Sequence, residues 1–184
     1  MNYCSHCGSK VTLKVPEGDN RSRHVCVQCD AIHYQNPRII AGCLPIYDDS
    51  VLLCRRAIEP RAGKWTLPAG FMENGETTEE AALRETREEA NARAEIMHLY
   101  TLFSLPHISQ VYLFYRARLL DLQFSPGEES LEVALFHEKD IPWDELAFPV
   151  IVETLEHYFS DRKEDHFPVR SREIIFRRRK KDSP

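Results

Sequence analysis

The feature that most constrains this chain is segment 70–92, in which a glycine-containing polar loop leads into a run rich in glutamate, alanine and arginine. Within it, Thr77 and Glu80 have the spacing of a capping box, in which each side chain bonds the other residue's backbone N–H. We therefore expect a helix to begin here and to run over about 78–90. An apolar stripe at helical spacing should pack this helix against the rest of the protein, and it consists of Leu83, Thr86 and Ala90.

Three glutamates lie together on a different face of the same expected helix. Glu85, Glu88 and Glu89 are three and four residues apart, so their carboxylates are neighbours. Like charges repel at this spacing, and a divalent cation reverses that cost. Hard oxygen ligands with part of the coordination shell left free suit Mg²⁺ or Mn²⁺, which also accept phosphate oxygens. The alternative is an acidic, solvated face that is partly paired with Arg84 and Arg87.

The spacing of these residues resembles the Nudix box: a glycine, five residues, a glutamate, seven residues, and then Arg-Glu-aliphatic-x-Glu-Glu-x-Gly-aliphatic. The matching positions of this chain are Gly70, Glu76, Arg84, Glu85, Glu88 and Glu89. Thr86 stands where the box has an aliphatic residue, and Ala92 is a smaller version of the last aliphatic one. Asn91 stands where the box has a glycine that ends the helix in a left-handed conformation, which asparagine also tolerates. None of these differences removes a carboxylate, so we expect the chain to keep the catalytic activity that the resemblance implies.

The resemblance implies a fold and a reaction. The fold is α/β (α+β), a Nudix α/β/α sandwich with a mixed sheet, and the reaction is hydrolysis of a nucleoside diphosphate linked to another group. Glu85, Glu88 and Glu89 would bind catalytic Mg²⁺ or Mn²⁺, with the backbone carbonyl of Ala69 as a further candidate ligand. The cations would polarise the pyrophosphate, activate water and neutralise the leaving phosphate, so that the P–O–P link breaks without a covalent intermediate.

Other positions of the box have an expected structural role. An ion pair between Glu76 and Arg84 should brace the loop against the helix, and Gly70 should give the loop its backbone freedom. Enzymes of the family that this chain resembles often take the general base from a later loop, where Glu129 and Glu132 are the candidates here. A charged turn before a strand is the alternative for that loop, and Glu89 itself could serve as the base.

Two Cys-x-x-Cys pairs lie near the N-terminus, separated by eighteen residues: Cys4, Cys7, Cys26 and Cys29. This is the spacing of a structural zinc site with four thiolate ligands. We therefore expect a zinc ribbon over residues 1–34, which is too small to bury a core and depends on Zn²⁺ for its stability. Two disulfides or a redox pair are the alternatives. His6, His24 and His33 could replace a ligand, although four thiolates already complete the shell.

Residues 35–168 should then form the Nudix domain. Apolar runs bounded by turn residues predict strands at about 39–47, 50–55, 65–67, 94–102, 110–120 and 131–137. A second helix is expected over about 149–160, where apolar residues recur at helical spacing. Cys43 and Cys54 lie within predicted strands and should be buried free thiols.

Residues 169–184 form a basic C-terminal tail in this division. The net charge from Arg170 onward is +5, whereas the remainder of the chain carries −10. We expect a solvated terminus, with contact to phosphates as the alternative. The acidic body argues against a general nucleic-acid-binding protein.

The chain also lacks signals for the membrane or for secretion. No run approaches the ~20 consecutive apolar residues that a membrane helix needs. Segment 1–10 lacks the charged-then-apolar layout of a secretory signal. We therefore expect a cytoplasmic protein with no membrane partner.

The arrangement as a whole resembles the plant plastid-type Nudix hydrolases that act on FAD and ADP-ribose. Shared-looking segments are 34–37, 64–70, 125–127 and 129–132. A ribbon before a Nudix domain also resembles the NADH pyrophosphatase group, but its Ser-Gln-Pro-Trp-Pro-Phe-Pro-x-Ser signature is absent here. The favoured small-molecule substrate is therefore ADP-ribose or FAD, split to AMP and the second phosphate. NADH and capped RNA are the alternatives, and the resemblance implies a homodimer.

Substrate contacts are expected from residues near the ends of strands. Arg55 and Arg56 could clamp phosphates, and Phe71 could stack on a base. Surface ion pairing and core packing are the respective alternatives. A reading from another class is a ribbon-led module that binds nucleic acid or protein, with the Nudix fold as its scaffold.

Overall fold

The computed structural model describes residues 1–175, which divide into two compact units between Pro37 and Arg38. The basic run at 177–181 lies outside the described residues. Among the described helices, none is long and apolar enough to cross a membrane.

The unit formed by residues 1–37 is a small antiparallel sheet beside the cysteines. Its strands pair in the order β1 (Val11–Lys14), β2 (Arg23–Cys26) and β3 (Ile32–His33). Val25 is buried in it, whereas Leu13 and Val15 remain mostly exposed. A unit of this size that buries so little apolar surface cannot be stable by itself. We therefore expect a bound metal that cross-links the cysteines to supply its stability.

The second unit is built on a mixed sheet, which has eight strands within the described residues. The central path runs β10–β5–β4–β9–β8–β11, with β6 paired to β5 and β7 paired to β4. Strand β4 is parallel to β9 and β11 is parallel to β8, while the other pairs are antiparallel. The bounds are β4 Arg38–Tyr47, β5 Ser50–Arg56, β6 Trp65–Thr66, β7 Ala69–Phe71, β8 Ala94–Leu105, β9 Gln110–Leu119, β10 Ser130–His137 and β11 Arg170–Glu173.

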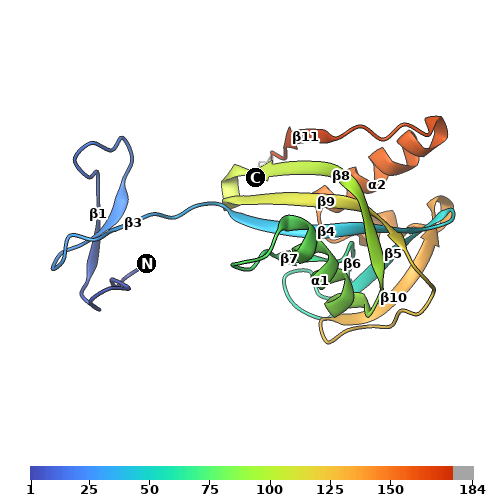
Figure 1. Ribbon diagram of the computed structural model, residues 1–184, viewed down its shortest axis with the longest axis horizontal. Coiled ribbons are helices and arrows are strands. Elements are labelled where there is room, and N and C mark those ends of the chain that lie inside the picture. Colours follow the sequence, from blue (N-terminus) through green and yellow to red (C-terminus); the bar gives the residue numbers. More distant parts are fainter. Residues whose placement is uncertain (176–184) are drawn as a thin grey trace, which may run out of the picture. The chain divides into compact units, whose positions relative to one another are not determined.

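Helices cover both faces of this sheet (Figure 1). The α-helices are α1 (Thr78–Ala90) and α2 (Pro149–Asp161), and short 3₁₀ turns lie at Pro106–Ile108, Glu138–Asp140, Trp143–Glu145 and Arg162–Glu164. On β4, Cys43 packs with α1, whereas the next residue, Leu44, packs with α2. Successive side chains of a strand point to opposite faces, so the two helices lie on opposite sides. The mixed sheet with helices packed on it is what the sequence pattern predicted, and the α/β/α sandwich is what the family resemblance implied.

The predicted helices agree closely with the observed ones, but three strand assignments differ. Strand β8 continues to Leu105 because β9 pairs along its whole length. The short strand β7, which carries Gly70, was expected to be loop, and it forms because β4 offers a free edge there.

The third difference concerns the start of the expected tail, where Arg170–Glu173 forms β11. Its two arginines are paired: Arg170 bonds the buried carboxylate of Asp161, and Arg172 lies 3.2 Å from Glu153. The start of the expected tail is therefore an edge strand of the sheet, although residues 171–173 are exposed.

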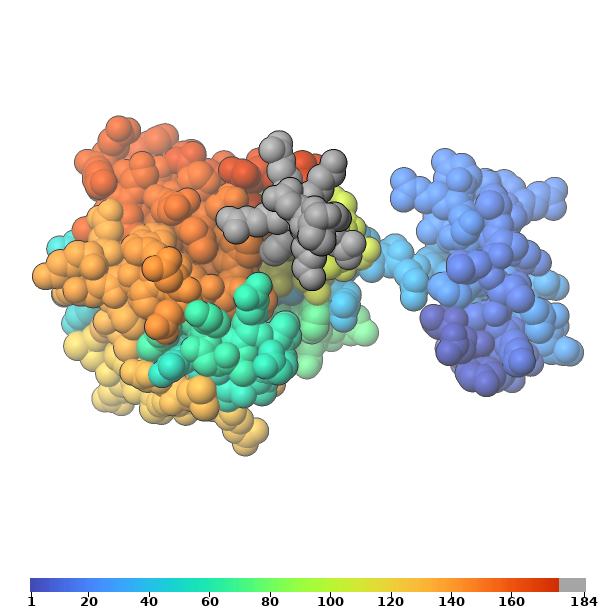
Figure 2. Space-filling view, turned by 180° about the vertical axis from the view of Figure 1, so that it is seen from behind, coloured from blue at the N-terminus to red at the C-terminus, as the bar shows by residue number. Residues whose placement is uncertain are grey.

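The loop between β5 and β6, residues 57–64, lies at the surface beside the segment that includes Trp143–Glu145 (Figure 2). Lys64 Nζ donates to the carbonyl of Asp144 at 3.3 Å, and the backbone of Ala147 donates to Trp65 at 2.8 Å. These contacts fix the end of β5, which carries Arg55 and Arg56.

Candidate active site and metal centre

Helix α1 begins at the predicted capping box and is held to the sheet by small residues. Thr77 Oγ1 accepts from the Glu80 N–H at 3.2 Å, and the Thr77 N–H donates to Glu80 Oε2 at 2.7 Å. Ala82 and Thr86 are fully buried under the sheet, while Leu83 is half-buried. The hydroxyl of Thr86 donates to the Ala82 carbonyl at 2.8 Å. This bond satisfies the buried hydroxyl at a position where the Nudix box has an aliphatic residue.

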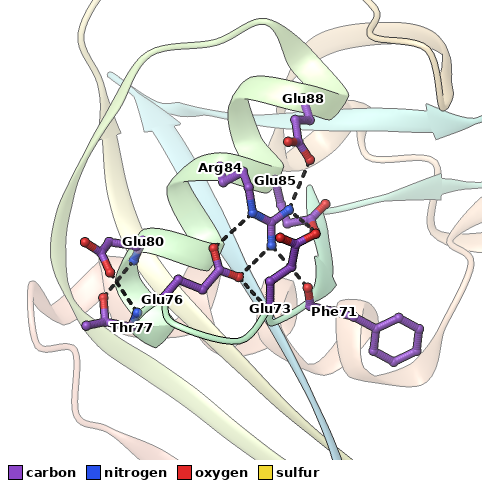
Figure 3. Close-up of polar contacts among 8 residues, drawn as sticks. All are labelled: Phe71, Glu73, Glu76, Thr77, Glu80, Arg84, Glu85 and Glu88. Atoms are coloured by element: carbon purple, nitrogen blue, oxygen red, sulfur yellow. Dashed lines mark hydrogen bonds and ion pairs between the residues drawn. The ribbon is translucent and has the colours of Figure 1, made fainter.

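Arg84, in the middle of α1, is the centre of an ion-pair cluster that joins the preceding loop to the helix (Figure 3). Its guanidinium donates to both oxygens of Glu76, at 2.7 and 3.0 Å, and this bidentate bond is the main reason that the pKa of Glu76 falls to about 2. The Nη1 atom also lies 2.7 Å from Glu85 and 3.0 Å from Glu88, and Nη2 donates to the Phe71 carbonyl at 3.1 Å. The loop before the helix is thereby fixed to the helix itself.

Glu85 occupies a space that exists because residue 70 is a glycine. A Cβ on Gly70 would lie 2.3 Å from Glu85 Oε1, well inside contact distance. Burial is the largest cause of the raised pKa of Glu85, and the charges of Glu88 and Glu129 act in the same direction. Gly70 lies in strand β7 and its φ is not positive, so its role is the close approach of a carboxylate and not the backbone freedom of a loop that the sequence suggested.

Glu89 is the most buried of the three carboxylates, with 7% of its surface exposed. Burial, followed by the charge of Glu85, raises its pKa to about 8, while Arg56 and the backbone of Ala69 act in the opposite direction. Its Oε2 atom is buried and has no hydrogen-bond partner. The helical spacing predicted the proximity of Glu85 and Glu89 but gave no signal for this burial.

These features fit a divalent cation. A buried carboxylate oxygen without a partner, next to a second carboxylate that repels it, is costly unless a positive charge comes between them. Among residues 1–175, however, only the four cysteines bring three or more candidate ligand atoms within 4.8 Å of one another. Joint binding by all three glutamates therefore requires their side chains to turn toward one another.

The two candidates for the general base have different surroundings. The charge of Glu129 contributes to the raised pKa of both Glu85 and Glu89, so Glu129 lies close to them. Glu132 is half-exposed and lies 3.6 Å from Arg55 on the neighbouring strand. The structure brings Glu129 to the carboxylates, and it brings Glu132 to Arg55.

The expected substrate contacts also separate into two groups. Burial raises the pKa of Tyr112, and the charge of Arg56 opposes this shift as it opposes that of Glu89, so Arg56 lies near both side chains. Its guanidinium also donates to the Pro60 carbonyl at 2.9 Å, and that of Arg55 donates to the Gly63 carbonyl at 3.0 Å. The ring of Phe71 is half-exposed and points away from Arg84 (Figure 3), and the guanidinium of Arg38 stacks on it at 4.7 Å. Nothing in the sequence spacing relates Arg38 to Phe71, so this contact could not be predicted from the sequence.

The four cysteines of the first unit have the geometry of a tetrahedral metal site. Their Sγ atoms lie 3.5 to 3.7 Å apart across the two pairs, close to the ~3.8 Å that four Zn–S bonds of about 2.3 Å give. Such separations exclude disulfides, in which sulfur atoms lie about 2.05 Å apart. Backbone N–H groups of His6 and Gln28 donate to Cys4 and Cys26, as metal-bound thiolates favour.

His33 is close to this cluster without completing it. Its Nε2 atom lies 3.3 Å from Cys4 Sγ, and the residue is buried. A ring N–H at this distance can donate to the thiolate of Cys4 and stabilise its charge. His33 would then support a metal ligand without binding the metal itself.

Comparison with known proteins agrees with both units. Residues 36–158 match the family model described as NUDIX domain, and residues 2–35 match the model described as Nudix N-terminal, a zinc ribbon. A crystal structure of a NUDIX hydrolase from Nitrosomonas europaea is 55% identical and covers 95% of this chain and 100% of that chain, with a TM-score of 0.90.

Relatives with named substrates are more distant. An ADP-ribose pyrophosphatase of Methanocaldococcus jannaschii is 29% identical over 124 residues, which cover 62% of this chain and 69% of that protein. The NAD-capped RNA hydrolase NudC of Photorhabdus laumondii is 38% identical over 93 residues, which cover 50% of this chain. The match spans 34% of the length of NudC. The match over residues 36–158 shows the family: this chain belongs to the NUDIX hydrolases and carries the N-terminal zinc ribbon found in part of that family.

Proposed function

We propose that the protein hydrolyses the pyrophosphate bond of a nucleoside diphosphate linked to a second group, with ADP-ribose or FAD as the favoured substrates. AMP and the second phosphate are the products. The observation that supports this most is the buried, unpartnered oxygen of Glu89, on whose carboxyl group the charges of Glu85 and Arg56 both act. A cation and an anionic substrate group meet complementary charges at this place.

Glu85, Glu88 and Glu89 would hold Mg²⁺ or Mn²⁺, with the carbonyl of Ala69 as a further ligand. When bound, the cations supply charge neutralisation at the phosphates and an activated water. Arg84 and Glu76 hold the loop and the helix in register, and Gly70 leaves room for Glu85.

Glu129 is the favoured general base because it lies near Glu85 and Glu89 on a separate loop. A base there can take a proton from water without giving up a metal ligand. Glu132, paired with Arg55, would orient the end of β5, and Glu89 remains the alternative base.

Recognition of the substrate would use the charge of Arg56 for the diphosphate and the exposed face of Phe71 for a base or flavin ring. The named activity of the Methanocaldococcus relative agrees with ADP-ribose. FAD remains a second favoured substrate, because it contains the same ADP half.

A second candidate activity is removal of a dinucleotide cap from RNA, or hydrolysis of NADH. The zinc ribbon and the similarity to NudC favour it. The chemistry at the P–O–P link is the same in both cases, so the two candidates differ only in what lies beyond the diphosphate.

The test is a product assay on ADP-ribose, FAD, NADH and NAD-capped RNA, with Mg²⁺ and then with Mn²⁺. We expect AMP from ADP-ribose or FAD at the highest kcat/KM. A higher kcat/KM on capped RNA would support the second candidate. No turnover of any substrate, together with salt-sensitive retention of RNA, would instead support the binding-module interpretation and overturn the proposed hydrolase activity.

A further inference from the structure

Asn91 ends α1 and makes contacts that no glycine at this position can make. Its backbone has φ 48° and ψ 24°, the left-handed conformation in which a glycine commonly ends a helix, and its N–H donates to Arg87 at 2.8 Å. Its side-chain amide then donates to the segment before β10. The acceptors, each at 3.2 Å, are the carbonyl and hydroxyl of Ser125 and the carbonyl of Pro126.

The segment that Asn91 contacts lies directly against the end of the helix. The Ser125 N–H donates to the Ala90 carbonyl at 2.9 Å, and the Gly127 N–H donates to the Glu89 carbonyl at 3.0 Å. A Cβ on Gly127 would lie 1.7 Å from the Glu88 carbonyl oxygen, so only glycine permits this approach. The loop therefore satisfies carbonyls that the end of a helix leaves without partners.

The same loop carries Glu129. Ser130 N–H donates to the Gly127 carbonyl at 3.1 Å, which turns the chain immediately after its contact with α1. On the other side, the Glu129 carbonyl accepts from Ala57 at 2.8 Å, next to Arg56. Glu129 is thus placed by one anchor on α1 and by another at the end of β5.

We propose that Asn91 is a positioning residue for Glu129, acting through the loop 125–127. This inference rests on the proposed function only in assigning Glu129 to the reaction. A glycine at position 91 would end the helix equally well, but it would leave the loop attached by the backbone bonds alone. The asparagine that stands at this position instead of the glycine of the Nudix box would then add a side-chain contact with the loop that a glycine cannot make.

The test compares Asn91→Gly, Asn91→Asp and Glu129→Gln on the best substrate of the panel. Asn91→Gly keeps the left-handed helix end and should fold, since glycine is the residue preferred there. Asn91→Asp keeps the shape but loses the N–H donors. We expect both to lower kcat about tenfold while KM changes less than about twofold, because a small displacement of a catalytic group acts on the chemical step.

A double variant separates positioning from general loosening. Asn91→Gly should have no further effect on kcat in the Glu129→Gln background, because the group that it positions is already gone. Arg93→Ala, which removes an exposed ion pair between Arg93 and Asp121 at the start of the same loop, should leave kcat unchanged. An unchanged kcat in Asn91→Gly, or the same tenfold loss in the Glu129→Gln background, would overturn the inference.

Amide hydrogen exchange gives a readout that does not need a substrate. Exchange at Ser125 and Gly127 should be faster in Asn91→Gly than in the parent protein, whereas exchange at the centre of α1 should not change. Equal exchange rates at Ser125 and Gly127 in the variant and in the parent would overturn the inference that Asn91 holds the loop 125–127 against α1. If the parent protein is inactive but exchange is faster in the variant, the proposed activity has failed, whereas the contact of Asn91 with the loop 125–127 is supported.

Discussion

Gly70 lies against the carboxylate of Glu85, with no room for even one further carbon atom between them. The Cβ of an alanine at position 70 would be 2.3 to 2.5 Å from both carboxylate oxygens of Glu85. The obstructing atoms are the free end of a flexible side chain, so the backbone can stay where it is while the carboxylate moves. The first glycine of the box therefore positions a proposed metal ligand.

Gly70→Ala should leave the fold intact and lower kcat by roughly 10- to 100-fold, since a displacement of about 1 Å in a catalytic group has effects of that size. The apparent affinity for Mg²⁺, measured by titrating the rate, should weaken at the same time. Glu85→Asp, which is one methylene shorter, should cost less in the Gly70→Ala background than in the parent. Full activity in Gly70→Ala would show that the position of Glu85 is unimportant.

The buried Glu89 makes the stability of the metal-free protein depend on pH. Its pKa is about 8 in the folded protein, against an ordinary value of 4.5. Between these values the folded chain holds a proton that the unfolded chain has lost, so raising the pH favours unfolding. The contribution of this group falls by up to about 1.4 kcal/mol per pH unit in that window.

Glu89→Gln removes this dependence and provides the comparison. The variant should be more stable than the parent at pH 8, and the difference should shrink steadily as the pH falls toward about 4.5. Urea unfolding in the presence of a chelator measures both proteins. A stability difference that is the same at pH 5 and pH 8 would contradict the raised pKa.

Single substitutions should separate the two candidate bases. Glu129→Gln should lower kcat by about 100-fold, the lower end of what general base catalysis contributes, at saturating Mg²⁺. Glu132→Gln should change kcat less than about threefold, because Glu132 pairs with Arg55 at 3.6 Å and both side chains are about half-exposed. Unchanged rates in both variants would leave Glu89 as the remaining candidate.

The sequence predicted the parts of the site that depend on local spacing. The capping box of Thr77 and Glu80, the bounds of α1 and the proximity of Glu85 to Glu89 all follow from helical geometry. The family resemblance added the pairing of Glu76 with Arg84. All of these residues lie in one loop and the helix that follows it, so the sequence of that single segment was enough to predict their arrangement.

What the sequence left open depends on distant segments meeting. The burial of Glu89 follows from packing around the end of α1, and the contact of Asn91 with Ser125 joins residues 34 positions apart. The strand at Arg170–Glu173 forms because β8 has a free edge, which composition alone does not reveal. Tertiary neighbours decided each of these features.

The first unit should require zinc. Cys29→Ser should reduce the bound zinc from one ion per chain to a small fraction, measured by elemental analysis, because three thiolates leave the tetrahedral shell incomplete. Strands β1–β3 should then lose their protection from hydrogen exchange, since so little apolar surface is buried there. His24→Ala is the matched control and should keep its zinc.

His33→Ala should give an intermediate result, because His33 contacts Cys4 Sγ from outside the shell. We expect it to keep one zinc ion per chain at micromolar zinc but to bind it about 10- to 100-fold more weakly in competition with a chelator. Complete loss of zinc would make His33 a ligand in place of one cysteine. Unchanged affinity would mean that the ring only fills space beside Cys4, and the support of that thiolate would then come from the His6 backbone N–H, 3.3 Å away.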